Sequence, residues 1–212
     1  MCFWSPFAPW LGGALALVWL TTLSSLLSTQ LPRRPLLLAS GLTLLGFMSW
    51  QVAYKGSPLP DWLEHTLSWS TPLLLWVALR QPTRWPLLAK MAIAATFTGH
   101  GLYALGWPAP TPPHFLFMTQ QTLSLSVPDA TALLRIAGGL DLLVSLGLFL
   151  PRVSRLALGY AVLWGSLTAL ARPVAYVALE TVGPDLHRWA MELVWRMPHA
   201  LVPLALLGSR AR

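Results

Sequence analysis

Cysteine is almost missing from this 212-residue sequence, which holds a single one at Cys2. One cysteine excludes an intrachain disulfide and any dithiol motif. Thiol-relay chemistry is therefore excluded unless a partner supplies the thiols. We expect no lipoprotein modification of Cys2, since no signal peptide precedes it. The first residues also lack a basic stretch, so we expect the apolar segment after them to be a retained membrane span.

Known catalytic and cofactor motifs are missing as well. The sequence contains no G-x-S-x-G, no H-E-x-x-H, no Walker loop and no G-x-G-x-x-G. The last apolar segment has no lysine, which excludes a rhodopsin-like retinal site. The histidines show no paired spacing of the kind that defines a zinc motif or a two-haem bundle. We therefore predict no metal site, and we favour haem less than other ligands. Whether the chain is catalytic stays open.

Charge is scarce too, at 10% of residues against 55% hydrophobic. That balance is far from the soluble average, and it indicates a chain whose solvent is the lipid bilayer. The net charge of +7 does not indicate a nucleic-acid partner, because the basic residues stand singly between apolar segments. Membrane topology explains these cations better than phosphate binding does.

Apolar segments recur along the chain at lengths that suit a membrane. About 20 residues at 1.5 Å each cross a hydrocarbon core of about 30 Å. Seven segments qualify, at 10–28, 35–54, 61–80, 85–107, 130–150, 154–177 and 187–208. The stretch 114–126 has only 13 residues, which is typical of an interfacial helix. We therefore expect an all-α integral membrane protein with seven transmembrane helices and a short interfacial helix between helices 4 and 5.

The basic residues predict the orientation of these spans. Cytoplasmic loops are enriched in Lys and Arg. Eight arginines follow odd-numbered segments and so share one side: Arg33, Arg34, Arg80, Arg84, Arg152, Arg155, Arg210 and Arg212. The other side holds two clear loop cations, Lys55 and Arg188, and most of the acids, among them Glu64. We expect the N-terminus outside and the C-terminus in the cytoplasm, in a multi-pass protein of a bacterial inner membrane.

Ionisable residues inside the expected spans predict a site. Each costs about 2.5 to 3.5 kcal/mol on insertion scales, so such residues face the bundle interior and pair. The depths of these residues in the bilayer indicate one polar pocket that opens outward. Its predicted residues are His100, Arg135, Asp141, Arg172, Glu192 and Arg196, with His65, His199 and Tyr103 in secondary positions. The arginines would supply positive charge, Asp141 and Glu192 would orient them, and His100 would exchange a proton or hydrogen-bond the ligand. The alternative is that these residues only hold helices together. In that alternative Glu192 pairs with a neighbouring arginine of its own helix, and Asp141 pairs with a facing arginine.

The later segments resemble a known family. The features are Phe97-Thr98-Gly99-His100-Gly101, an external Pro-containing stretch, Gly138-Gly139-Leu140-Asp141-Leu142-Leu143, and Gly147-Leu148-Phe149-Leu150 before a basic turn. In this order they resemble the DoxX/DoxD-like membrane proteins, a redox-associated four-helix family. The resemblance implies a four-helix bundle over 85–212, preceded by three extra helices over 1–84 that serve as scaffold or docking surface. It covers no cysteine, so direct sulfur chemistry does not carry over.

Three functions fit these observations. The first is association with a redox or respiratory complex, with an outward-facing polar pocket for a quinone head group or a small anion. The second is a non-catalytic accessory subunit that packs against other membrane subunits, pigments or lipids. The third is a small-solute transporter. Its expected signs, an inverted repeat or discontinuous helices in matching halves, are not evident, although Pro198 and Pro203 could break the last segment.

Overall fold

A computed structural model describes residues 33–56, 59–177 and 192–209, and every regular element in these ranges is a helix. Residues 192–196 form a further helical stretch. The predicted first span, 10–28, lies outside the described residues. The helices are α2 (Arg33–Lys55), α3 (Leu59–Glu64), α4 (Thr66–Arg80), α5 (Trp85–Leu105), α6 (Pro113–Leu123), α7 (Val127–Gly147), α8 (Ser154–Val177) and α10 (Pro198–Gly208).

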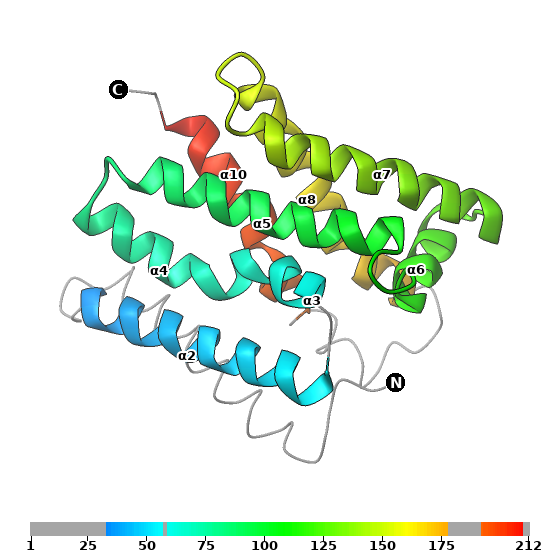
Figure 1. Ribbon diagram of the computed structural model, residues 1–212, viewed down its shortest axis with the longest axis horizontal. Helices are drawn as coiled ribbons and strands as arrows, with labels where there is room; N and C mark the ends of the chain where they lie inside the picture. The colour runs from blue at the N-terminus through cyan, green and yellow to red at the C-terminus, as the bar shows by residue number, and fades with distance from the viewer. Residues whose placement is uncertain (1–32, 57–58, 178–191, 210–212) are drawn as a thin grey trace.

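The bundle is organised around α5, which contacts α3, α4, α7 and α10 (Figure 1). On one side α4 separates α5 from α2, and on the other α7 lies alongside α5. α8 and α10 pack against each other, and the short α6 contacts both α7 and α8. The main apolar core joins residues of α4, α5, α8 and α10, such as Leu67, Ile93, Phe97, Ala161 and Val202. This arrangement leaves α6, α7 and α8 as three sides of a space next to α5.

The local sequence explains where α7 begins and where α5 ends. At α7 the Ser126 hydroxyl accepts a hydrogen bond from the Asp129 N–H at 3.3 Å, which satisfies one of the free donors of the first turn. A proline also stands in that first turn, where its missing N–H costs nothing. α5 ends at Leu105, and the next residue, Gly106, has a φ of 77°, the left-handed conformation that glycine adopts without strain.

The number of spans differs from the sequence-based expectation. α2, α5, α7 and α8 each coincide with a predicted span, and α6 coincides with the predicted interfacial helix. By length and apolarity, however, only Arg34–Tyr54 and Val127–Gly147 qualify as membrane-crossing helices within the described residues. Seven transmembrane helices are therefore not supported. Two causes are visible: α5 and α8 carry buried ionisable side chains that lower their hydropathy, and two predicted spans are interrupted.

The first interruption divides the predicted span 61–80. α3 ends at Glu64 and α4 begins at Thr66, with His65 between them at φ −93° and ψ 7°. A break in a helix frees backbone groups that need new partners when they are buried. The Leu67 N–H donates to the Thr96 hydroxyl of α5 at 3.0 Å, and His199 Nε2 lies 3.2 Å from the Glu64 carbonyl oxygen. Side chains from two other helices thus stabilise the break.

The second interruption divides the predicted span 187–208, of which residues from 192 onward are described. Met197 lies between the helical residues 192–196 and α10, which begins at Pro198, and it keeps helical backbone angles (φ −50°, ψ −36°), so the interruption is the hydrogen bond that Pro198 lacks and not an unwound turn. Proline cannot donate the hydrogen bond that would continue the helix. The Ser68 hydroxyl of α4 donates to the Trp195 carbonyl oxygen at 2.9 Å. The two breaks therefore face each other in the middle of the bundle.

Glycines decide which helices touch most closely. A Cβ on Gly138 of α7 would lie 2.8 Å from the Gly101 carbonyl oxygen of α5, and a Cβ on Gly101 would lie 2.8 Å from the Gly138 carbonyl oxygen. No side chain fits at either position without moving a helix. The neighbouring Gly139 has no described atom within 4 Å of its Cβ position. Small residues at such crossings let backbones approach, as they do between membrane helices.

We predict opposite effects for two adjacent substitutions. Gly138→Ala will lower the midpoint of thermal unfolding, because the new methyl group would force α5 and α7 apart. Gly139→Ala will leave the midpoint unchanged or raise it, since alanine stabilises a helix by about 0.5 to 1 kcal/mol relative to glycine. Circular dichroism of the two purified variants measures both midpoints. Equal midpoints would contradict the observed α5–α7 contact.

Candidate functional site

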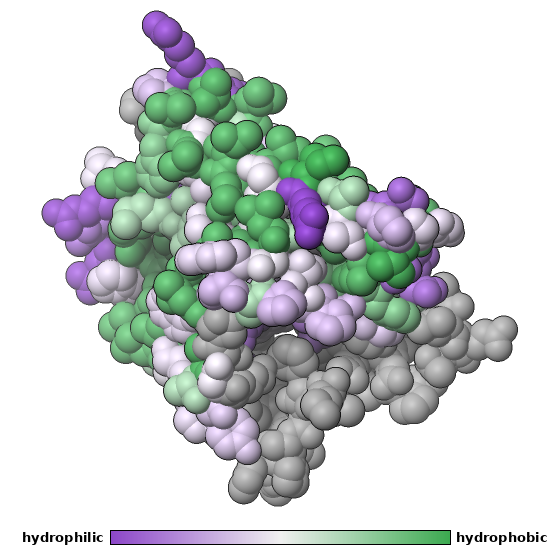
Figure 2. Space-filling view, turned by 45° about the vertical axis from the view of Figure 1, so that its right-hand side comes forward, coloured by the Kyte–Doolittle hydropathy of each residue, from purple (hydrophilic) through white to green (hydrophobic). Residues whose placement is uncertain are grey.

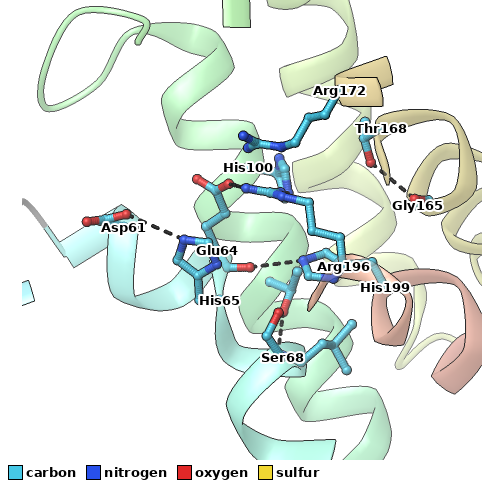
Figure 3. Close-up of polar contacts among 12 residues, drawn as sticks. Asp61, Glu64, His65, Ser68, His100, Gly165, Thr168, Arg172, Arg196 and His199 are labelled. Carbon is cyan, nitrogen blue, oxygen red and sulfur yellow. Dashed lines mark hydrogen bonds and ion pairs between the residues drawn. The ribbon is translucent and has the colours of Figure 1, made fainter. Parts of the chain in front are cut away.

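A buried ion pair joins the two helix breaks. Arg196 Nη2 lies 2.6 Å from Glu64 Oε1, and each of the two residues is 3% exposed (Figure 3). Glu64 is the last residue of α3 and Arg196 is the last helical residue before Met197. A buried pair is tolerated when its charges compensate each other and their remaining hydrogen-bonding atoms find partners. The ion pair therefore fixes the two breaks relative to each other.

Three histidines surround this ion pair. His100 Nε2 of α5 lies 3.9 Å from Glu64 Oε1 and 3.3 Å from Arg196 Nη1. The His199 ring contacts the His100 ring edge to face, with centroids 5.8 Å apart. His65 lies between Asp61, 3.8 Å from its carboxylate, and the indole N–H of Trp195, which is 3.4 Å from Nδ1. No group of three His, Cys, Asp or Glu residues suited to a metal ion occurs in the described ranges.

Two glycines explain why α3 and α10 come so close to their neighbours. A Cβ on Gly99 would lie 2.7 Å from the Pro60 carbonyl oxygen and 2.9 Å from Glu64 Cα. A Cβ on Gly165 of α8 would lie 2.8 Å from the His199 carbonyl carbon. Gly99 thus lets α3 pack on α5, and this contact brings the Glu64 carboxylate inside rather than into an external loop.

A second ion pair lies beside the first. Arg172 Nη1 of α8 is 3.6 Å from Glu192 Oε2, and Figure 3 shows the Arg172 side chain lying next to His100. Arg172 is buried, whereas Glu192 is part-exposed. Each buried arginine keeps an Nε atom that has no hydrogen-bond partner among the described residues. These two N–H groups are therefore enclosed without an acceptor among the described residues.

Next to these arginines is a cavity of about 210 Å³. Its walls come from α5, α6, α7 and α8 and are largely apolar, with Phe115, Met118, Leu134, Ala137, Trp164, Leu167 and Ala171 among the lining residues. His100, Arg172 and Arg196 also line it. Leu123 and Leu167 line the cavity while about half exposed, so the cavity opens to the surface at these residues. The arrangement suits a molecule with an apolar body and a polar group.

Asp141 provides another polar point in the same cavity. It is 2% exposed, and its Oδ1 accepts a hydrogen bond from the Tyr160 hydroxyl at 3.0 Å. Within the described ranges Asp141 therefore hydrogen-bonds with Tyr160 and Trp164 of α8, and not with a facing arginine. Ser145, one turn further along α7, donates to the carbonyl oxygens of Asp141 and Ala94. α7 is thereby joined to α5 on the side of the helix that faces the interior.

His114, at the start of the short helix α6, is the remaining histidine near the site. Burial lowers the pKa of His114 to about 4, and the positive charge of Arg172 contributes to this lowering. His114 is therefore neutral at pH 7 and adds no positive charge beside the arginines. Its ring packs against Phe115, one of the cavity residues, with centroids 4.9 Å apart.

The structure brings together some of the residues predicted for the pocket and separates others. His100, Asp141, Arg172 and Arg196 line the cavity, and Glu192 contacts it through Arg172. Arg135 is exposed on α7 and is not among the lining residues. His65 and His199 lie beside Glu64 outside the cavity wall, and Tyr103 packs edge-on against Phe115 behind it. Among the described residues the ion-pair partner of Glu192 is Arg172 of α8, and Arg188 lies outside those residues.

Glu64 is the site residue that sequence reasoning missed, since it was counted among the external acids. The signal that could have found it is the run Gly99-His100-Gly101, whose small residues indicate that another backbone packs closely on this helix. On the Gly99 side the packing partner proves to be α3, and Glu64 is the residue that this contact buries. Which helix would fill that position could not be told from spacing alone.

Comparison with known proteins gives no relative: no family model, no curated protein and no solved structure matches the chain. The resemblance to DoxX/DoxD-like proteins and the division at residue 84 therefore stay predictions. The site has to be interpreted from its own geometry.

We predict that Glu64→Gln will destabilise the protein, because it leaves the Arg196 charge buried without a counter-charge. Removing one partner of a buried ion pair costs about 3 to 5 kcal/mol. The double variant Glu64→Gln with Arg196→Gln will be more stable than the sum of the two single losses implies, since neither charge is then left alone. Chemical unfolding of the four proteins measures this coupling, and strictly additive losses would contradict the ion pair.

Proposed function

We propose that this chain is a multi-pass protein of a bacterial inner membrane whose cavity binds the head group of a quinone. The membrane placement is supported by the distribution of side chains. Buried positions include Glu64, Asp141, Arg172 and Arg196, while leucines such as Leu156 are exposed. Figure 2 shows apolar side chains spread over much of one face. Ionisable groups inside and leucines outside are expected where lipid is the solvent.

The arrangement of the connections supports the orientation. The start of α2, the α4–α5 connection and the α7–α8 connection lie toward one end of the bundle in Figure 1. In the sequence these are the places that carry Arg33 and Arg34, Arg80 and Arg84, and Arg152 and Arg155. We place this end in the cytoplasm, according to the positive-inside rule.

We predict that single cysteines will report this orientation. In a Cys2→Ser background, Ala109→Cys in the α5–α6 connection will react with a membrane-impermeant maleimide in intact cells, because that end faces outward. Thr83→Cys in the α4–α5 connection will react only after the membrane is permeabilised. The reverse pattern would overturn the orientation, and a protein that is fully extracted from cells without detergent would overturn the membrane placement.

The observation that carries the ligand proposal is the position of two arginines, Arg172 and Arg196, in the wall of an otherwise largely apolar cavity. Both arginines already have a carboxylate partner, Glu192 and Glu64 respectively. The described site thus has no excess positive charge to attract an anion. A neutral acceptor such as a quinone carbonyl would accept from a guanidinium group in the cavity wall without adding an unpaired buried charge.

The remaining lining residues suit the rest of such a ligand. Phe115 and Trp164 offer aromatic surfaces for a ring, and Leu134 and Ala137 provide an apolar wall. The opening at Leu123 and Leu167 gives an isoprenoid tail a route toward the lipid. Many ligand pockets share this plan, with apolar walls and a few polar groups that fix orientation.

We predict that two substitutions will reduce the quinone that is retained by the purified protein. Ala171→Phe will fill the cavity. Arg172→Gln will remove a donor, with a loss of about 10- to 150-fold because a hydrogen bond to a charged group contributes about 1.5 to 3 kcal/mol. Extraction followed by chromatography measures the quinone per protein.

The matched controls are Leu170→Phe, at the exposed neighbour of Ala171, and Arg135→Gln, at the exposed arginine of α7. Both controls should retain quinone as the wild type does. Wild-type protein without quinone, even after incubation with it, would overturn the ligand proposal.

Small-solute transport is a second candidate, and one observation favours it. The two interrupted helices face each other at Glu64 and Arg196, and discontinuous helices hold substrate sites in many transporters. An accessory role in a larger complex would instead leave the cavity substitutions without effect on any bound ligand. The quinone measurement separates these candidates from the proposed function.

A further inference from the structure

The three histidines around the Glu64–Arg196 ion pair contact partners whose hydrogen-bonding roles are fixed. A neutral imidazole has one nitrogen that donates and one that accepts, and the partner of either nitrogen decides which of them carries the proton. Arginine and tryptophan side chains can only donate, and a carbonyl oxygen can only accept. The partners therefore assign the position of the proton on each ring.

His65 and His199 carry this proton on Nε2 (Figure 3). The Trp195 indole N–H donates to His65 Nδ1 at 3.4 Å, which leaves the proton on Nε2, 3.8 Å from the Asp61 carboxylate. His199 Nε2 is 3.2 Å from the Glu64 carbonyl oxygen and must donate to it. His199 Nδ1 is then an acceptor, and it is enclosed without a partner among the described residues.

His100 has the opposite arrangement. Its Nε2 lies 3.3 Å from Arg196 Nη1, which can only donate, and 3.9 Å from Glu64 Oε1, which is too long for a hydrogen bond. Nε2 is therefore the acceptor, and the proton is on Nδ1. His100 Nδ1 has no hydrogen bond to any described residue, and unlike His199 Nδ1 it is not an enclosed atom. Because His100 lines the cavity, this N–H is available to a ligand there.

We propose that His100 donates a hydrogen bond from Nδ1 to a carbonyl oxygen of the cavity ligand, and that Arg196 is the positioning residue that keeps the proton on Nδ1. This inference rests on the proposed quinone site and names the atom that recognises the quinone oxygen. A carbonyl oxygen has two lone pairs, so it can accept from His100 and from a guanidinium group of the wall together. Phe115, stacked on the His100 ring with centroids 5.8 Å apart, fixes the plane of the imidazole.

The position of the proton is tested without any ligand. In purified protein with isotope-labelled histidine, nitrogen NMR distinguishes Nδ1 from Nε2 by their couplings to the ring protons, and the signals of His100 are those missing from His100→Asn. We expect His100 to be protonated on Nδ1 and His65 on Nε2. A wild-type His100 protonated on Nε2 would overturn the proposal.

A double variant tests the role of Arg196. Glu64→Leu with Arg196→Leu removes both charges, so that neither is left buried alone. We expect protonation of His100 Nε2 to appear in this variant, because no donor then faces that nitrogen. A His100 that stays protonated on Nδ1 alone would show that Arg196 does not set the position of the proton.

Two amides distinguish the two nitrogens of His100 in ligand binding. An asparagine amide reaches the position of Nδ1, and a glutamine amide reaches that of Nε2. His100→Asn should retain quinone within about twofold of the wild type, whereas His100→Gln should lose about two- to tenfold, the effect of one hydrogen bond. His65→Gln is the matched control at a histidine outside the cavity lining, and it should retain quinone as the wild type does.

The outcomes separate this proposal from the proposed function. Equal retention by the two His100 variants, from a wild type that does retain quinone, would overturn the role of Nδ1 and leave the quinone site in place. Wild-type protein that retains no quinone would overturn the proposed function, and with it this role of His100, whatever the nitrogen spectra show.

Discussion

The ion pair between Glu64 and Arg196 is the interaction on which the rest of the described structure depends. It connects two chain segments that both interrupt a helix at the same place, between α3 and α4 and before α10. Each break frees backbone groups, and each is stabilised by side chains of the other segment, through His199 and Ser68. The pair also places Arg196 at the wall of the cavity. One contact therefore links the two interrupted helices to the candidate site.

Much of the helix pattern could be predicted from the sequence. α7 shows why: a serine cap, a proline in the first turn and an uninterrupted apolar stretch are all local signals. The break at His65 was not predictable in this way, since neither glycine nor proline marks it. Its partners, Thr96 and His199, belong to helices far away in the chain. A break stabilised by tertiary contacts leaves no local signal.

The candidate site also has features that could be predicted from the sequence and features that could not. His100, Asp141, Arg172 and Arg196 could be named from sequence, because an ionisable group in an apolar segment needs an interior position. Their partners could not, since pairing depends on which helices are neighbours. Arg135 is an example of a wrong site prediction. It lies on the same helix as Asp141, but its side chain points to a different side of that helix. At about 100° per residue, helical spacing alone separates the two side chains.

The opening of the cavity at Leu123 and Leu167 has a consequence for how any occupant arrives. Under the membrane placement that we propose, an opening bordered by leucines connects to the lipid phase and not to water. Occupancy would then follow the mole fraction of the ligand among the lipids, whatever its concentration in solution. Diluting the bilayer with detergent would empty the site as effectively as removing the ligand would.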